Sequence, residues 1–124
     1  MEKCYRLTIE YTQQREQFGS PLSKFQALQH RMVDMFMETE YTKSFLLKVL
    51  ATEDKDEKTK LIYGLKNQIS KSGKLVGEEA VQLHGGMGVT DELNVGHYFK
   101  RLTTVGTIFG NTDYHLKKLS LIHI

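Results

Sequence analysis

The chain has 124 residues, of which 40% are hydrophobic and 26% charged, and this suits one domain with a single core. Its formal net charge of +2, without a block of Lys or Arg, argues against a nucleic-acid partner. No apolar run approaches the roughly 18 residues of a membrane span, and residues 1–3 do not begin a signal peptide. The single cysteine, Cys4, cannot form an internal disulfide, which suits a reducing compartment.

The first helix is predicted over residues 1–14. Cys4, Leu7 and Tyr11 recur there at spacings of three and four, which indicates one helical face. Gly19 follows as a stop signal. Because no capping residue precedes the pattern, we expect that the chain was cut from something longer.

A second and longer helix is predicted over roughly residues 22–51. Ser20 suits its N-cap and Pro21 its first turn, and apolar residues then recur at helical spacing. The charged run over residues 53–58 that follows predicts a solvated turn.

The third helix carries the clearest periodicity in the sequence, with Asp54 or Asp56 as its predicted N-cap. One face is apolar and small at spacings of three and four: Leu61, Leu65, Ile69, Ser72, Val76, Ala80 and Leu83. Gly73 and Gly77 lie on or beside this face, and each costs a helix up to about 1 kcal/mol relative to alanine. We therefore expect another helix to approach closely here, from within the chain or from a second copy.

The remaining residues predict two shorter helices. One is capped at Thr90 and continues through residue 101, a break covers residues 103–110, and Asn111 or Thr112 caps a last helix that reaches about residue 121. With one proline and no convincing alternating strand, the predicted class is all-α. The expected architecture is a single domain over residues 1–124, an antiparallel four-helix bundle of three long helices and shorter C-terminal ones.

Searches for known catalytic and metal-binding patterns fail. The five histidines have neither HxxxH spacing nor carboxylate support, so we predict no metal site: His30, His84, His97, His115 and His123. The chain also lacks a nucleophile elbow and a G-x-G-x-x-G loop.

Residues 82–88 are the most distinctive stretch, because three of these seven residues are glycines at the end of the third helix. Gly85 or Gly86 can serve as a C-cap in the left-handed conformation, which is one interpretation. The other is a glycine-lined surface that lies against a flat or phosphate-bearing ligand. Other polar groups at predicted helix ends suit such a ligand, although several could converge only if two copies of the chain pair: Arg15, Gln26, Gln82 and Thr112.

Two motifs resemble the C-terminal helical domain of acyl-CoA dehydrogenases. Residues 15–19 carry R-x-x-F-G, followed by similar residues over 25–32, and residues 78–88 end in Q-L-H-G-G-x-G. The resemblance covers residues 1 to about 119. It implies a flavoprotein in which this domain of one protomer contacts the FAD of its neighbour.

The resemblance also implies which residues contact the cofactor. Three would lie against or near the pyrophosphate and adenosine portion of FAD: Arg15, Phe18 and Gln26. Four would line the adenine side of the partner's cofactor: Gln82, Leu83, Gly85 and Gly86. Thr112, a candidate from its place at a predicted helix end and not from the resemblance, completes the set.

The chain departs from the family pattern in three ways. The family's N-terminal helical domain and middle β domain are absent, so we do not expect a complete active site from this chain alone. Many members carry a catalytic Glu in a Tyr-Glu-Gly-Thr segment before the last helix, and here Gly110 or Asn111 occupies that position, depending on the alignment. Neither can accept a proton, so the base stays unassigned. Residues 119–124 differ from the family's usual ending and predict an irregular tail.

The resulting hypothesis is an FAD-contacting and oligomerisation domain of an acyl-CoA dehydrogenase-like flavoenzyme. In the intact protein the reaction implied is α,β-dehydrogenation of an acyl-CoA, by loss of a proton from Cα and transfer of hydride from Cβ to the flavin. The implied partners are a second copy in a homodimer or homotetramer, acyl-CoA, and an electron-accepting flavoprotein, in bacterial cytoplasm or the mitochondrial matrix. Two alternatives stay open: a non-catalytic assembly module of the same family, and a helical oligomerisation module without a cofactor.

Overall fold

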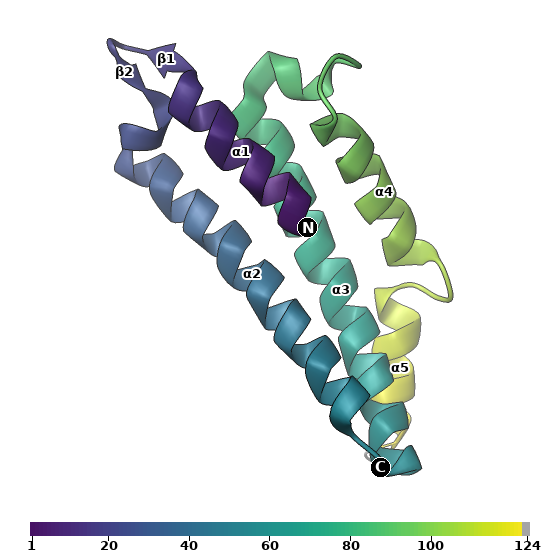
Figure 1. Ribbon diagram of the computed structural model, residues 1–124. Helices are drawn as coiled ribbons and strands as arrows, with labels where there is room; N and C mark the ends of the chain where they lie inside the picture. Colours follow the sequence, from purple (N-terminus) through teal and green to yellow (C-terminus); the bar gives the residue numbers. More distant parts are fainter. Residues whose placement is uncertain (123–124) are drawn as a thin grey trace.

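The computed structural model describes residues 1–122 as an all-α bundle, which confirms the predicted class (Figure 1). The described chain forms five α-helices: α1 (Glu2–Gln14), α2 (Gln26–Ala51), α3 (Lys55–His84), α4 (Val95–Thr107) and α5 (Thr112–Ile122). Short elements join them: strands β1 (Glu16–Gln17) and β2 (Ser20–Pro21) and the 3-10 turns η1 (Leu22–Lys24) and η2 (Gly85–Val89). Helices α2 and α3 lie antiparallel, with α1 beside them and α4 and α5 packed against α3.

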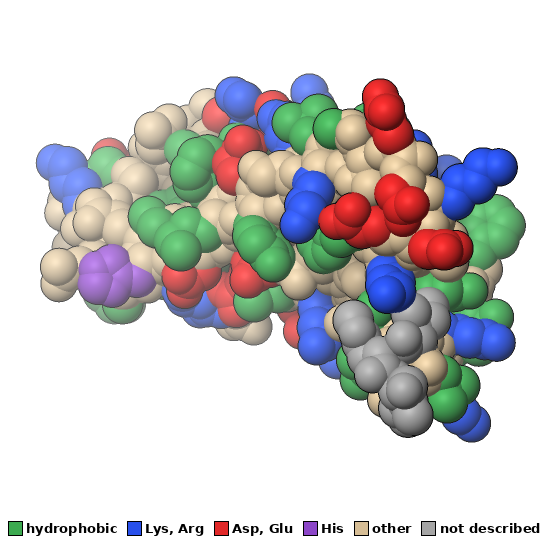
Figure 2. Space-filling model, turned by 90° about the horizontal axis from the view of Figure 1, so that it is seen from below, with side chains coloured by type: hydrophobic (Ala, Val, Ile, Leu, Met, Phe, Trp, Pro, Cys, Tyr) green, Lys and Arg blue, Asp and Glu red, His purple; other side chains and the backbone are tan. Residues whose placement is uncertain are grey.

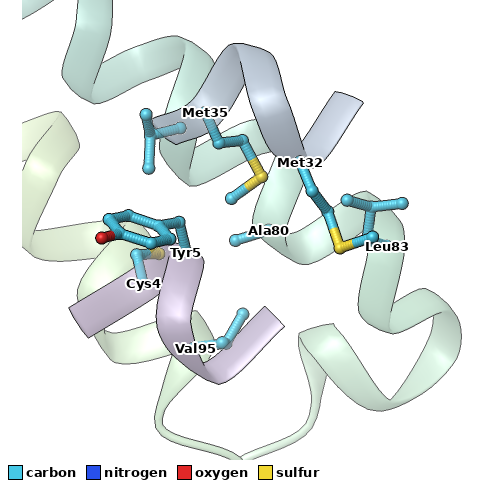
Figure 3. Packing of buried hydrophobic residues seen from close by; sticks show 8 residues of the cluster. Cys4, Tyr5, Met32, Met35, Ala80, Leu83 and Val95 are labelled. Atoms are coloured by element: carbon cyan, nitrogen blue, oxygen red, sulfur yellow. The ribbon is translucent and has the colours of Figure 1, made fainter. Parts of the chain in front are cut away.

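The core lies where α1, α2, α3 and the start of α4 meet (Figure 3). It is built from eight buried side chains: Cys4, Tyr5, Met32, Met35, Val76, Ala80, Leu83 and Val95. The periodic face predicted for the third helix supplies three of them, because residues at spacings of three and four share one side of a helix. Burial also raises the pKa of the Cys4 thiol, so the thiol stays neutral as a small apolar packer.

The two glycines in the middle of α3 let α4 pack closely against it. A Cβ atom at Gly77 would lie 2.9 Å from Cδ2 of Phe99, and one at Gly73 would lie 3.4 Å from Cδ2 of Leu102. The close helix approach expected from the sequence therefore comes from within the chain. Lys66 strengthens the same contact, because its Nζ donates to the carbonyl oxygen of Val105 at 2.7 Å.

The connection between the first two helices differs from the prediction. Ser20 and Pro21 do not start a helix; they pair with Gln17 and Glu16 as an antiparallel two-residue ladder. Helix α2 begins only at Gln26, and no side chain caps it. The prediction that Ser20 would be the N-cap is therefore wrong, because pairing across the turn fixes the backbone of these residues as strand.

The predicted boundaries near the C-terminus are also partly wrong. The fourth helix begins at Val95 rather than after Thr90, and it continues to Thr107, through most of the expected break. Asn111 caps α5, since its side-chain oxygen accepts from the backbone N–H of Tyr114 at 2.9 Å. Helix α5 is regular as far as Ile122, so the expected irregular tail is not found there, and residues 123–124 lie outside the described part of the chain.

The turn from α2 to α3 forms a charged end of the molecule. Asp54, one of the two residues predicted for this role, is the N-cap of α3, and its carboxylate accepts from the backbone N–H of Glu57 at 2.7 Å. Figure 2 shows acidic and basic side chains intermingled at this end, which matches the predicted solvated turn. Within residues 1–122, none of the helices combines the length and apolarity needed to cross a membrane.

Candidate functional site

The candidate site is an open cleft of about 550 Å³ at the end of the bundle where α1 and α3 terminate. In Figure 1 this is the end that carries the β1–β2 hairpin. The lining comes from the ends of α1 and α3, the hairpin segment and the start of α2: Tyr11, Arg15, Gln17, Leu22, Leu28, Arg31, Gln82, Leu83, His84, Gly85, Gly86 and Met87. Such a cleft, partly apolar with a few polar groups at its walls, suits a small-molecule ligand.

Arg15 is fixed at one wall by its backbone. Its N–H donates to the carbonyl oxygen of Tyr11 at 2.8 Å, which closes the last turn of α1. Its own carbonyl oxygen accepts from the N–H of Leu22 at 2.8 Å, which holds the returning chain beside it. Within residues 1–122, no carboxylate forms an ion pair with the Arg15 side chain. The guanidinium group can therefore bind an anionic group such as a phosphate.

The glycines at the opposite wall have different physical roles. Gly85 is the C-cap of α3 with φ of +61°, a conformation that favours glycine, so the predicted helix stop is confirmed. A Cβ atom at Gly88 would lie 2.5 Å from the carbonyl oxygen of Val81, so Gly88 is required by packing. Gly86 has neither a positive φ nor any atom of residues 1–122 within 4 Å of an added Cβ. Neither its backbone conformation nor packing within the described chain requires a glycine there.

A second guanidinium group lies at the edge of the cleft. Arg31 of α2 donates from Nε to the Glu79 carboxylate of α3, which raises the pKa of Arg31. This ion pair joins α2 to α3 beside the cleft and leaves the remaining donors of Arg31 available.

His84 and Tyr11 form a stacked pair between the two walls. Their ring centroids lie 4.4 Å apart and the ring planes differ by 27°. His84 is only 4% exposed, and its Nδ1 lies 2.7 Å from the carbonyl oxygen of Ala80. Burial lowers the pKa of His84, so the ring is neutral near neutral pH, with its proton on Nδ1.

The structure brings together five of the eight cofactor-binding candidates in this cleft: Arg15, Gln82, Leu83, Gly85 and Gly86. The other three lie elsewhere. Phe18 is 92% exposed at the tip of the hairpin, with φ of +54°, and Gln26 is an exposed residue at the start of α2. Thr112 lines a separate hollow of about 420 Å³ between α3, α4 and α5.

Sequence reasoning did not assign a site role to several lining residues, chiefly Tyr11, Arg31 and Met87. Tyr11 was assigned only to the apolar face of the first helix. A signal for it exists in retrospect: Tyr11 lies one helical turn before Arg15 and so shares its side of α1. Within residues 1–122, no group of three or more His, Cys, Asp or Glu side chains could hold a metal ion.

Comparison with known proteins identifies the family. The sequence pattern of the acyl-CoA dehydrogenase C-terminal domain matches residues 1–120. The acyl-CoA dehydrogenase IpdE2 of Mycolicibacterium smegmatis is 32% identical over 117 residues, which are 94% of this chain and 36% of that protein. The chain belongs to the acyl-CoA dehydrogenase family and corresponds to its C-terminal domain. It spans about a third of the length of the curated relatives it matches first.

Solved structures agree with this assignment. Butyryl-CoA dehydrogenase from Megasphaera elsdenii is 26% identical, with a TM-score of 0.88 over 96% of this chain and 31% of that one. A structure described as the electron transferring flavoprotein of Acidaminococcus fermentans is 27% identical, with a TM-score of 0.91 over 99% of this chain and 33% of that one. The family resemblance inferred from the two sequence motifs is therefore confirmed.

Proposed function

We propose that this chain is the FAD-contacting and oligomerisation domain of an acyl-CoA dehydrogenase-like flavoenzyme. The observation that carries the proposal is Gly86. Neither its backbone conformation nor packing within residues 1–122 calls for a glycine there, yet it lies in a cleft with Arg15. Since the absence of a side chain at Gly86 is not explained within the described chain, we infer that it leaves room for a ligand or for another protomer.

The residues of the cleft fit the dinucleotide part of FAD. The forked donors of Arg15 suit the pyrophosphate, and the Gln82 amide can both donate to and accept from an adenine ring. The Cβ-free surface of Gly85 and Gly86 allows a flat ring to approach the backbone closely. When bound in the intact protein, FAD would accept the hydride in α,β-dehydrogenation of an acyl-CoA. The family relationship also leads us to propose an electron-accepting flavoprotein as partner and the bacterial cytoplasm or mitochondrial matrix as the site of action.

A second copy of the chain would complete the site. The cleft is open, and Phe18 extends from the hairpin in a backbone conformation that is uncommon for a bulky residue. Within its own fold the Phe18 ring packs edge to face against Phe25, with 6.2 Å between the ring centroids, yet nearly all of its surface stays exposed, which favours an intermolecular contact. Helix α2 also exposes large apolar side chains, which suits a homodimer or homotetramer: Val33, Met37, Tyr41, Leu47 and Leu50.

Sedimentation of the purified chain with and without FAD tests the proposal. We expect FAD to bind with a shift in its absorbance spectrum and to increase the proportion of paired copies, because the cofactor would be held between protomers. Arg15→Gln should weaken both effects while leaving the helical content unchanged. An association that is unaffected by FAD, with no FAD bound, would support the cofactor-free oligomerisation module instead.

A non-catalytic assembly module of the same family is the second candidate, and it is favoured by the residues at the position of the family's catalytic Glu. Gly110 and Asn111 stand there, and neither can take a proton from Cα of a substrate. The intact protein that carries this domain separates the two candidates. Flavin that is bound and bleached by acyl-CoA supports the dehydrogenase, whereas flavin that is bound and stays oxidised supports the assembly module.

A further inference from the structure

The stacked rings of Tyr11 and His84 directly connect the two walls of the cleft. Tyr11 belongs to the last turn of α1, and its carbonyl oxygen accepts from the N–H of Arg15 at 2.8 Å. His84 is the last residue of α3 and directly precedes Gly85. The separation of 4.4 Å between the two ring centroids therefore constrains the distance between Arg15 and the glycine corner.

Tyr11 and His84 also line a second hollow beside the cleft. This smaller hollow, of about 240 Å³, lies between α1 and the segment before α4, and Tyr11 and His84 line it together with Glu10, Gln14 and Glu92. Since both residues line both spaces, we expect truncation of either ring to remove part of what divides them. The ligand cleft would then become wider and open toward two carboxylates.

The His84 ring is held from a second direction. A carbonyl oxygen only accepts hydrogen bonds, so Nδ1 of His84 carries the proton and donates to Ala80 at 2.7 Å. The ring is thus attached to the backbone of its own helix on one edge and to Tyr11 on one face. A ring restrained in this way has little rotamer freedom left to lose when a ligand binds, which favours affinity.

We propose that Tyr11 and His84 are positioning residues for the nucleotide cleft: the stacked pair sets the spacing between Arg15 and the corner formed by Gln82, Gly85 and Gly86. This inference rests on the proposed function, because it concerns the same cleft. It adds that the affinity for a dinucleotide depends on two rings that hold the walls of the cleft at a fixed separation. Tyr11 contacts His84 through its ring, so the proposed role depends on the ring and not on the phenol oxygen.

Isothermal titration of the full chain with FAD, and with ADP as the part of FAD that carries pyrophosphate and adenosine, tests this proposal. Tyr11→Phe keeps the ring and should bind ADP within about twofold of the wild type. Tyr11→Leu removes the ring and should weaken binding about tenfold, because the two walls are then no longer held at a fixed separation and the ligand must order them. Val49→Ala is the control: Val49 is buried, lies in α2 near its far end, and does not line the cleft.

The outcomes separate a positioning role from a merely structural one. Loss of ADP affinity in Tyr11→Leu, with Tyr11→Phe unaffected and Val49→Ala binding normally despite lower stability in urea, supports the proposal. Equal affinity of Tyr11→Leu and Tyr11→Phe overturns it while leaving the proposed function intact. An equal loss of ADP affinity in Tyr11→Leu and Val49→Ala would mean that the stack acts only through the stability of the fold, and this also overturns the proposal. If Tyr11→Leu does not fold, His84→Phe compared with His84→Leu makes the same test, and a wild-type chain that binds neither ADP nor FAD overturns both proposals.

Discussion

Alanine substitutions at Gly86 and Gly88 separate ligand approach from internal packing within one turn of chain. At Gly88 an added Cβ would lie 2.5 Å from the carbonyl oxygen and 3.1 Å from the Cα of Val81, both backbone atoms that cannot move aside alone. At Gly86 the same atom would meet nothing in residues 1–122 within 4 Å. The two substitutions are chemically identical, so any difference between them reports the surroundings.

The expected magnitudes follow from these distances. Overpacking against a fixed backbone costs typically about 1–3 kcal/mol, and Gly88→Ala should lower the free energy of unfolding by this amount or more. Gly86→Ala adds no clash and restricts the unfolded chain, which changes stability by about 0.4–1 kcal/mol in the favourable direction. The midpoint of thermal unfolding should therefore fall by several degrees for Gly88→Ala and stay level or rise for Gly86→Ala.

Urea unfolding followed by circular dichroism measures the stabilities, and titration with FAD measures the affinities of the same two proteins. We expect Gly86→Ala to weaken FAD binding although its stability is equal to or higher than that of the wild type, because its methyl group extends into space that the ligand would occupy. A Gly86→Ala variant that loses as much stability as Gly88→Ala would refute the structural reasoning. A variant of normal stability and normal FAD affinity would refute the functional role of Gly86.

Three further predictions concern the core and its titration. Met35→Ala, at a fully buried side chain, should lower the free energy of unfolding by about 2–5 kcal/mol in urea. Gly77→Ala gains up to about 1 kcal/mol in helix propensity but forces its methyl group to 2.9 Å from the Phe99 ring, so calorimetry should show a net loss. The pKa of His84 lies below its ordinary value of 6.5 in the folded chain because the ring is buried. The unfolded chain then binds more protons than the folded chain just below pH 6.5. The contribution of His84 to the free energy of unfolding should therefore be fully present above that pH and should decrease as the pH is lowered through it. Unfolding at pH 7.5 and 5.5 should show this loss in the wild type and a smaller one in His84→Leu.

Local chemistry explains what could be predicted from the sequence. The cap at Asp54 and the stop at Gly85 depend on interactions within four residues, and both occur as expected. The periodic face of the third helix is likewise confirmed, because a helix 30 residues long averages over local exceptions. The motif that contains Arg15 and the one that contains Gln82 converge because α1 and α3 end at the same end of the bundle.

The errors arise where distant residues determine the outcome. Ser20 has the chemistry of an N-cap, but pairing with Gln17 makes it a strand residue. Thr112 lies at a helix end, as expected, but the packing of α5 places it in a separate hollow from Arg15, and its contact with the cofactor is still a prediction. The stack of Tyr11 on His84 joins residues 73 positions apart, and no spacing rule in a single sequence indicates such a pair.

The region that follows α4 bears directly on whether the intact protein is a dehydrogenase. Gly110 has φ of +101°, and a Cβ atom there would lie 2.6 Å from Cδ1 of Tyr114, so a glutamate could not replace it without moving that ring. Asn111 is already engaged, since its side-chain oxygen caps α5. Both residues that could align with the family's catalytic Glu therefore have structural roles in this chain. It follows that Gly110→Glu would not restore a base in this backbone, and that any proton abstraction in an intact protein with this domain needs a base from another region or another subunit.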